Sequence, residues 1–218
     1  MKAVLIGATG ATGKEVLDLL LANEKFTEVV ALVRKPLAIA HEKLRAVVVD
    51  FDNLSRWSDV IQGDVALSCL GTTLKDAGSK EAQFKVDHDY QQEFAKLAKK
   101  NGVSTFLLIS SSGADPKSWI FYSRMKGQLE REIEGLNFES FLAFRPGALV
   151  RPQSDRKGEK IGVSVISFFN KIGLFRNMAP LPVRRLAALM VRYSISPPIG
   201  YTIVGSGRII KESKELLK

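Results

Sequence analysis

The chain has 218 residues, 45% of them apolar and 25% charged, which is typical of one globular domain and excludes collagen-like, coiled-coil and disordered proteins. A single cysteine, Cys69, and two distant histidines, His41 and His88, exclude a disulfide framework and argue against a metal site built from these residue types. The 32 basic residues outnumber the 23 acidic ones, and the net charge of +9 fits a nucleic acid, an anionic membrane surface, or an anionic cofactor or substrate as the binding partner.

The N-terminus begins with a short apolar run that ends at Gly7. A secretory signal needs about 7–15 apolar residues, and a membrane span needs about 18. The sequence shows neither pattern, so we expect a cytoplasmic protein with no membrane span. The lone Cys69 agrees with a reducing compartment.

Short apolar strands alternate with amphipathic helices through the first two thirds of the chain. Gly102 and Gly135 each end a helix. Near-continuous apolar strands that alternate with helices form parallel sheets buried on both faces, so we expect an α/β fold, a Rossmann-type doubly wound parallel sheet. The expected strands are residues 3–6, 29–33, 46–49, 65–70, 105–109 and 140–144, and the expected helices are residues 14–22, 55–62, 80–101 and 119–134.

The chain changes character after Pro146. Residues 151–160 are polar and charged, as in a loop. This part depends too much on the sheet to form a separate domain, so we expect one domain over residues 1–218, with its core over 1–150 and a small C-terminal cap on the substrate side over 151–218. Within the cap we expect helices at residues 163–175, 183–193 and 211–217 and a last strand at residues 201–204.

A glycine-rich loop follows the first expected strand and opens the first expected helix, with the spacing G-x-x-G-x-x-G. Glycine permits a tight turn and lets backbone N–H groups approach a pyrophosphate, which the helix N-terminus attracts. Such a loop can also serve only to pack a strand on a helix, but its place before the first of several alternating units favours dinucleotide binding. The residues expected to bind are Gly7, Thr9, Gly10, Ala11, Thr12 and Gly13.

The second expected strand ends in two cations, Arg34 and Lys35, and no carboxylate stands there. An acidic residue at this place binds the ribose 2′-hydroxyl of NAD, whereas a guanidinium can bind the 2′-phosphate of NADP in a fork. We therefore expect NADPH (NADP) as the cofactor, with Arg34 and Lys35 on its 2′-phosphate. A solvated basic loop is the plainer alternative.

Two further strand ends are expected to line the cofactor. Asp50 and Phe51, after the third strand, are placed to meet the edge of the adenine ring. Cys69 is expected to be a small packing residue and not a nucleophile, because no base lies next to it in sequence. The segment after the fourth strand should line the ribose and pyrophosphate, and it consists of Cys69, Leu70, Gly71, Thr72 and Thr73.

A serine cluster at residues 110–112 ends the fifth strand, and Tyr122 and Lys126 share one face of the helix that follows. When a hydride reaches a carbonyl carbon, the oxygen needs a proton. The Lys126 ammonium is expected to lower the pKa of Tyr122 so that the phenol can transfer that proton. We expect Ser111 to orient the carbonyl, with Ser112 as the alternate, and Lys126 also to hold the nicotinamide ribose. A Tyr-x-x-x-Lys pair alone often arises by chance. A catalytic role is favoured here because the glycine loop, the serine cluster and the Tyr-Lys pair follow one another in the order typical of such enzymes.

These segments together resemble an atypical short-chain dehydrogenase/reductase, and within that family the branch of the HIV Tat-interacting protein and its small bacterial homologues. The resemblance implies NADPH binding in a Rossmann fold, and it places Pro146 and Gly147 beside the nicotinamide. The physiological substrate of this branch is poorly defined. The segments that carry the resemblance are residues 7–13, 69–73, 86–90, 110–115, 122–127 and 144–147.

We therefore expect an NADPH-dependent oxidoreductase that reduces a small-molecule carbonyl substrate, as a monomer or homodimer. One alternative is an NADPH-binding, redox-sensing regulatory protein without turnover, against which the presence of Tyr122 and Lys126 argues. Another is a nucleotide-sugar epimerase-like enzyme, for which residues 151–218 leave little room.

The basic residues fall into several groups and form no single stripe with interleaved aromatics, which argues against nucleic acid as the partner. The group at residues 151–160 lies near the expected substrate mouth, which permits an acidic substrate. Candidates for the wall of that mouth are residues 149–151, Phe168, Phe169 and Phe175, although these phenylalanines also fit a plain core.

Overall fold

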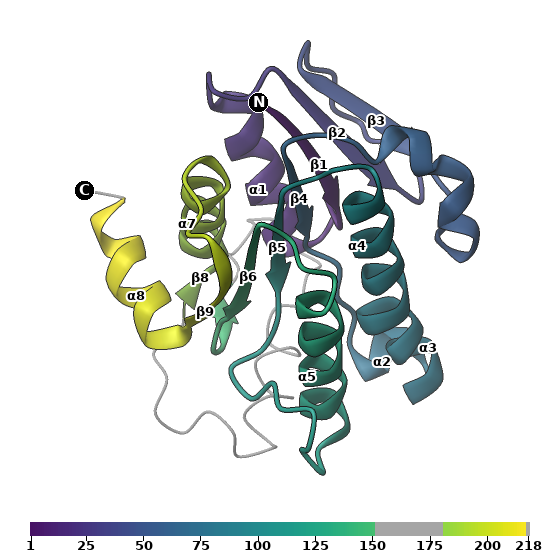
Figure 1. The fold of residues 1–218 in the computed structure, drawn as a ribbon, viewed down its shortest axis with the longest axis vertical. Coiled ribbons are helices and arrows are strands. Elements are labelled where there is room, and N and C mark those ends of the chain that lie inside the picture. Colours follow the sequence, from purple (N-terminus) through teal and green to yellow (C-terminus); the bar gives the residue numbers. More distant parts are fainter. Residues whose placement is uncertain (151–180, 217–218) are drawn as a thin grey trace, which may run out of the picture.

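The structure of the chain is a computed structural model that describes residues 1–150 and 181–216. Within these ranges, seven strands form one sheet in the order β3-β2-β1-β4-β5-β6-β9, and every pairing is parallel (Figure 1). This is the doubly wound order with one strand added beyond β6, so the predicted fold class is confirmed. The strands are β1 (Lys2–Ile6), β2 (Glu28–Val33), β3 (Leu44–Val48), β4 (Val65–Ser68), β5 (Thr105–Ile109), β6 (Ser140–Arg145) and β9 (Gly200–Gly205).

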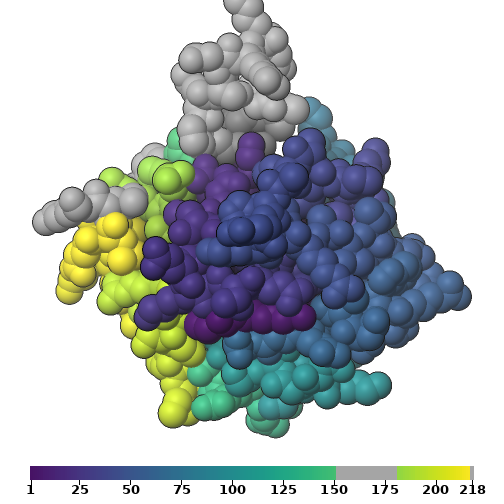
Figure 2. Space-filling view, turned by 90° about the horizontal axis from the view of Figure 1, so that it is seen from above, coloured from purple at the N-terminus to yellow at the C-terminus, as the bar shows by residue number. Residues whose placement is uncertain are grey.

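Helices cover both faces of the sheet (Figure 1). One face carries α1 (Ala11–Ala22), α7 (Val183–Ile195) and α8 (Ser206–Glu215). The other carries the 3-10 helix η1 (Phe51–Val60), α4 (Tyr90–Lys100) and α5 (Phe121–Glu134). In the view from above, the C-terminal helices form one flank of the molecule beside the N-terminal elements (Figure 2). Burial on both faces explains why the central strands are apolar at most positions.

Strand β1 illustrates this double burial. Leu5 belongs to the core under α1 and α7, whereas Val4 and Ile6 belong to the core under α4 and α5, and all three side chains are fully buried. Successive side chains of a strand point to opposite faces, so a strand that is covered on both sides needs an unbroken apolar run. The edge strand β3 differs, because Val48 remains 48% exposed there.

The helix predicted over residues 80–101 is divided into three elements. These are α3 (Lys80–Phe84), a π-helical turn η2 (Lys85–Asp89) and α4. In the π turn the Tyr90 N–H donates to the carbonyl oxygen of Lys85, five residues earlier. Apolar spacing does not predict this wider turn, in which the Asp87 carbonyl oxygen accepts from the side chains of Gln91 and Lys126.

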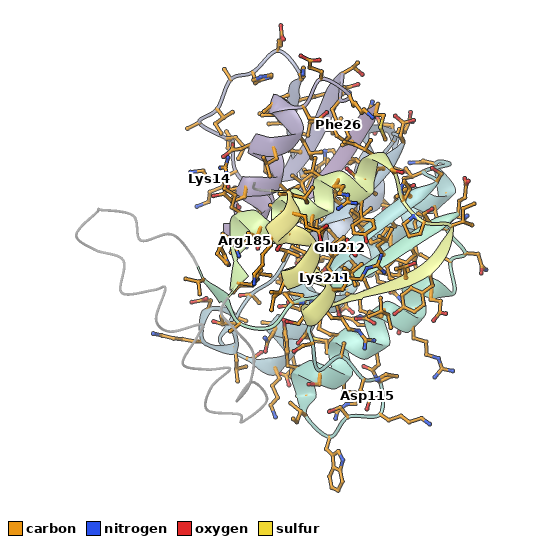
Figure 3. The ribbon with its side chains drawn as sticks, turned by 90° about the vertical axis from the view of Figure 1, so that its left-hand side faces the viewer. Lys14, Phe26, Asp115, Arg185, Lys211 and Glu212 are labelled. Carbon is orange, nitrogen blue, oxygen red and sulfur yellow. The ribbon has the colours of Figure 1, made fainter. Side chains whose placement is uncertain are left out.

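The described part of the C-terminal segment extends the sheet and packs on its α1 face. Lys14 of α1 and Arg185 of α7 lie on the same side of the molecule, where the two helices pack together (Figure 3). Two short strands not expected from the sequence, β7 (Leu149–Val150) and β8 (Leu181–Pro182), pair in parallel. The predicted loop at 151–160, the helix at 163–175 and the wall residues Arg151, Phe168, Phe169 and Phe175 lie outside the described residues.

Candidate active site

A cavity of about 190 Å³ lies at the carboxyl ends of β4 and β5, beside the N-terminus of α1. It joins the glycine loop, the segment after β4 and the predicted catalytic helix, which are far apart in sequence. Parallel strands end at one edge of a sheet, so the loops that follow them meet there. The cavity is lined by Gly10, Ala11, Thr12, Cys69, Leu70, Gly71, Asp87, Ile109, Ser110, Tyr122, Lys126, Leu149 and Val183.

The glycine loop brings its backbone against the segment after β4. Gly7 has a φ of +83°, and a Cβ on it would lie 2.4 Å from the carbonyl carbon of Cys69. A Cβ on Gly13 would lie 2.0 Å from the carbonyl oxygen of Gly7. Both positions therefore need glycine so that β1, α1 and the end of β4 can pack closely.

The N-terminus of α1 faces the cavity with no side chain over it. Gly10 is the N-cap residue, no side chain caps the helix, and its first turn contains no acidic residue. The first N–H groups of a helix have no partner within the helix, and they carry partial positive charge. This end of the cavity therefore suits an anion such as a pyrophosphate.

Cys69 packs below the loop, 3.2 Å from the position that a Cβ on Gly13 would take. Burial raises the pKa of its thiol far above the usual value. A reactive cysteine needs the opposite shift. The structure therefore agrees with the expected packing role.

Lys126 forms a buried ion pair with Asp87 of the π turn. Its Nζ lies 3.4 Å from Asp87 Oδ1 and donates to the Asp87 carbonyl oxygen at 3.3 Å, and the two residues are 1% and 0% exposed. The other carboxylate oxygen, Oδ2, accepts the N–H of Thr72 at 2.9 Å. Asp87 belongs to a segment that the sequence analysis singled out, but no role was assigned to it.

The electrostatics at Tyr122 differ from the expectation. Burial, and after it the negative charge of Asp87, raise the pKa of the Tyr122 phenol above its ordinary value. The direction of this shift is opposite to the predicted lowering by Lys126, first because the phenol is buried and second because the carboxylate of Asp87 lies against the ammonium. Burial also raises the pKa of Asp87, and Lys126 acts against that shift.

Ser110 is the member of the serine cluster that lines the cavity. Its hydroxyl donates to Glu130 Oε1. Ser111, the residue expected to orient a carbonyl, is buried one residue further on, and its carbonyl oxygen accepts the N–H of Ala114. The N–H of Ser112 donates to the carbonyl oxygen of Pro146 at 3.1 Å, which ties the cluster to the segment after β6.

Gly127 allows the loop after the serine cluster to pass against α5. A Cβ on Gly127 would lie 2.3 Å from the carbonyl carbon of Asp115, which lies near the start of that helix (Figure 3). The N–H of Asp115 also donates to the carbonyl oxygen of Ser123 at 3.0 Å. This close packing sets the position of Tyr122 relative to the end of β5.

The predicted adenine-side residues lie at the same edge of the sheet but outside the cavity. Arg34 and Lys35 follow β2 and are exposed. Asp50 follows Val49, whose N–H donates to the carbonyl oxygen of Val33. The Asp50 carboxylate caps η1 by accepting the N–H of Asp52 at 2.9 Å. The Phe51 ring is buried, with its centre 5.5 Å from that of Tyr90. Asp50 and Phe51 thus shape the turn after β3.

Pro146 and Gly147, expected beside the nicotinamide, connect β6 to β7. Pro146 is buried and Gly147 is half-buried. Leu149, two residues further on, lines the cavity. The segment therefore reaches the same cavity through β7.

Residues 7–162 match a family model described as NAD(P)H-binding. The chain belongs to the NAD(P)H-binding atypical short-chain dehydrogenases/reductases. A rat protein, HTATIP2, is 34% identical over 220 residues, which cover 98% of this chain and 86% of the rat protein. The mitochondrial protein FMP52 of Kluyveromyces lactis is 31% identical over 207 residues, which cover 94% of this chain and 84% of FMP52. The resemblance predicted from the motifs is confirmed.

Solved structures agree on the fold of this reductase family. The UDP-glucose 4-epimerase of Thermotoga maritima, solved with UDP-glucose, matches with a TM-score of 0.71 at 14% identity, over 99% of this chain and 81% of the epimerase. The oxidoreductase ylbE of Lactococcus lactis matches with a TM-score of 0.67 at 20% identity, over 100% of this chain and 97% of ylbE. At these identities the likeness concerns the fold alone.

The relatives correct the predicted location of this family member. The FMP52 proteins of Kluyveromyces lactis and Saccharomyces cerevisiae are both named mitochondrial. The prediction of a cytoplasmic protein is therefore wrong. It rested on the short apolar run before Gly7, which tests only for a secretory signal, whereas mitochondrial transit peptides are amphipathic and rich in arginine and serine.

Within residues 1–150 and 181–216, none of the helices of this reductase-family chain has the length and apolar character of a membrane span. The same residues contain no group of three or more histidine, cysteine or acidic side chains arranged to hold a metal ion.

Glu130 holds α5 to the sheet. It is 2% exposed, it accepts from Arg145 Nε of β6 at 3.0 Å, and it accepts from the Tyr201 hydroxyl of β9 at 2.8 Å, in addition to the Ser110 hydroxyl. The sequence analysis missed this residue. The available signal was its spacing, because Tyr122, Lys126 and Glu130 follow one another at steps of four along one helix face.

Replacing Glu130 by glutamine is expected to lower the free energy of unfolding by about 2 kcal/mol, because it removes a buried charge that Arg145 faces. The partial exposure of Arg145 keeps the loss below that of a fully buried pair. Urea unfolding measures the change. The control is Glu134→Gln on the same helix, whose carboxylate makes none of these contacts and whose replacement should leave stability within about 0.5 kcal/mol. Equal stability of Glu130→Gln and the native protein would contradict the prediction.

Proposed function

We propose that the protein is an NADPH-dependent reductase of a small carbonyl compound, in which Tyr122 donates a proton and Lys126 holds the nicotinamide ribose. The observation that carries this proposal is the single cavity that joins the helix N-terminus behind the glycine loop to Tyr122 and Lys126. Family membership supports the cofactor class as NAD(P)H.

The residues around the cavity fit a dinucleotide. Gly7 and Gly13 let the loop and α1 pack closely, Gly10 lines the cavity without a side chain, and the N-terminus of α1 offers N–H donors to a pyrophosphate. Lys126 has three N–H donors, of which one is used in the hydrogen bond to the Asp87 carbonyl oxygen, while the ammonium also forms an ion pair with Asp87 Oδ1. A further N–H donor of Lys126 suits a ribose hydroxyl. A bound reduced nicotinamide supplies a hydride, and with it two electrons, to the carbonyl carbon of the substrate.

The side chains of the chain itself complete the reaction. The Tyr122 hydroxyl gives its proton to the carbonyl oxygen, which yields an alcohol, and the phenolate regains a proton from water. Ser110 donates its own hydroxyl proton to Glu130, so it has none to offer a carbonyl. This supports Ser111 as the serine that orients the substrate.

The reductase proposal is tested with a panel of aldehydes and ketones, by following the loss of NADPH absorbance. The native protein is expected to oxidise NADPH with at least one of these compounds, and Tyr122→Phe is expected to fail with the same compound. NADPH binding without turnover above that of Tyr122→Phe would overturn the reductase and favour a cofactor-sensing regulatory protein.

Cofactor choice gives a second test. Replacing Arg34 by alanine is expected to weaken NADPH binding about tenfold or more and to leave NADH binding within about twofold, because only NADPH has a 2′-phosphate for the guanidinium. Fluorescence titration of both cofactors measures the two dissociation constants. Lys100→Ala is a control of equal charge at the C-terminal end of α4, and it should change neither constant. A native protein that binds NADH as tightly as NADPH would contradict the assignment.

A further inference from the structure

One buried oxygen atom in the cavity has no hydrogen-bond partner among the described residues. Asp87 Oδ1 is inaccessible to solvent, lines the cavity, and makes only its ion pair with Lys126 Nζ at 3.4 Å. A buried carboxylate is costly unless its charge is compensated, and breaking such a pair by removing one partner is strongly destabilising. Because this costly arrangement lies beside the proposed catalytic tyrosine, Asp87 is a candidate for a role in the reaction.

The surrounding chain holds Asp87 in this position from several directions. Thr72 fixes the second carboxylate oxygen through its N–H at 2.9 Å. Gln91, itself fully buried, donates to the Asp87 carbonyl oxygen at 2.9 Å and accepts the Ser68 hydroxyl at 2.8 Å. The π turn is thus tied to the end of β4 and to the segment after it, with one carboxylate oxygen of Asp87 bonded to Thr72 and the other facing Lys126.

The charged groups near the pair divide into two sets. Lys126 and Tyr122, both on α5, face Asp87 across the cavity. His88, the next residue of the π turn, is directed elsewhere, because its Nδ1 lies 2.9 Å from Asp89 Oδ1 and its Nε2 lies 3.4 Å from Glu132 Oε2. Asp87 is therefore the negative charge that Lys126 and Tyr122 share.

We propose that Asp87 is a positioning residue that fixes the Lys126 ammonium and offsets its charge, so that Tyr122 meets a carbonyl substrate as a neutral phenol. The proposal rests on the reductase function above and adds a direction to it. A neutral phenol carries the proton that carbonyl reduction requires, whereas alcohol oxidation requires the phenolate as a base. At neutral pH the site therefore holds Tyr122 in the protonated form that carbonyl reduction uses.

The direct test is the ionisation of Tyr122 in Asp87→Asn. The amide keeps an oxygen for the Thr72 N–H and removes the negative charge, so Lys126 acts on the phenol without compensation. Tyrosinate absorbance near 295 nm is followed against pH, and the signal of Tyr122 is taken as the difference from the same protein with Tyr122→Phe. The pKa of Tyr122 is expected to fall by about 1–3 pH units relative to the native protein. An unchanged titration would overturn the proposal.

Asp89→Asn is the matched control, because it removes an equal charge from the same π turn, and Asp89 is exposed and does not line the cavity. Asp89→Asn should leave the pKa of Tyr122 unchanged from that of the native protein. Asp87→Glu keeps the charge and should move the titration much less than Asp87→Asn. A shift as large in Asp89→Asn as in Asp87→Asn would also overturn the proposal, since it would show a general effect of net charge.

Two further measurements keep the test decisive. If Asp87→Asn does not fold, carbon-13 NMR of the native protein, with the Asp87 carboxyl assigned through the backbone, shows its state at pH 7. An ionised carboxylate supports the proposal, and a neutral acid overturns it because no charge would then offset Lys126. Where turnover is found, oxidation of the product alcohol should move to lower pH in Asp87→Asn. Because the titration needs no turnover, a protein without reductase activity still decides the role of Asp87.

Discussion

Replacing Tyr122 by phenylalanine is expected to reduce kcat for NADPH-dependent carbonyl reduction by about 10²–10⁴-fold, with little change in the dissociation constant of NADPH. The phenol is the proton donor in the proposed reaction, and proton transfer by a positioned side chain contributes a factor of this size. The ring stays in place in the variant, so the packing of α5 against the cavity is kept. Steady-state kinetics and cofactor titration measure the two effects separately.

Tyr193→Phe is the control for this substitution. Tyr193 lies on α7, and its hydroxyl bonds to Glu212 and Arg208, away from the cavity that holds Tyr122. Its loss should leave kcat within about twofold, even where stability falls slightly. If Tyr122→Phe retained the activity of the native protein, Tyr122 would not be the proton donor, whatever the effect at Tyr193.

The pH dependence of reduction follows from the direction of the shift at Tyr122. Burial and Asp87 raise the pKa of the phenol, so the protonated donor is the dominant form through neutral and mildly alkaline pH. Because the donor is lost only as pH rises through that raised pKa, kcat should stay constant across this range and fall only at strongly alkaline pH.

Replacing Gly13 by alanine is expected to destabilise the folded protein by about 3 kcal/mol or more, or to prevent folding. The added methyl group would lie 2.0 Å from the carbonyl oxygen of Gly7 and 2.7 Å from its carbonyl carbon. These atoms belong to backbone and cannot swing aside as a side chain would, so α1 must move away from β1. Thermal and urea unfolding measure the loss.

Gly10→Ala provides the contrast within the same loop. Gly10 has φ −75° and ψ 168°, which alanine adopts readily, and its added Cβ would lie 3.3 Å from Gly7 O. The stability of this variant should therefore stay within about 1 kcal/mol of the native value, while the methyl group at the cavity weakens NADPH binding about tenfold. Equal stability of the Gly13→Ala and Gly10→Ala proteins would show that the close contact at Gly13 is unimportant.

The apolar and glycine patterns within single segments predicted the fold well wherever an element depends only on its own residues. The apolar run of β1, the three glycines after it and the helix that follows all lie where the sequence analysis expects them. The strands at β5 and β6 begin at the predicted residues Thr105 and Ser140. Burial on both faces leaves an unbroken apolar run, so such strands are visible without knowledge of their neighbours.

The π turn and the networks around it could not be predicted in the same way. Asp87 and Gln91 appear in the sequence as polar residues of a long helix, which are ordinarily exposed. Their burial depends on Thr72, Lys126 and Ser68, each from a different element. Pairings of this kind arise from the approach of distant segments, and no spacing rule within one helix specifies them.

The sequence by itself determined the parallel sheet, the glycine loop at its first crossover, and the Tyr122 and Lys126 pair four residues apart on one helix face, because each depends on the periodicity of a single segment. The tertiary structure decided what that pair can do. It buried the phenol of Tyr122 and placed the carboxylate of Asp87 against Lys126, and both raise the pKa of Tyr122, opposite to the expected shift. The reason is physical: the pKa of a tyrosine depends on its burial and on all charged groups that surround it in space, and Asp87 comes from a segment about 35 residues away along the chain.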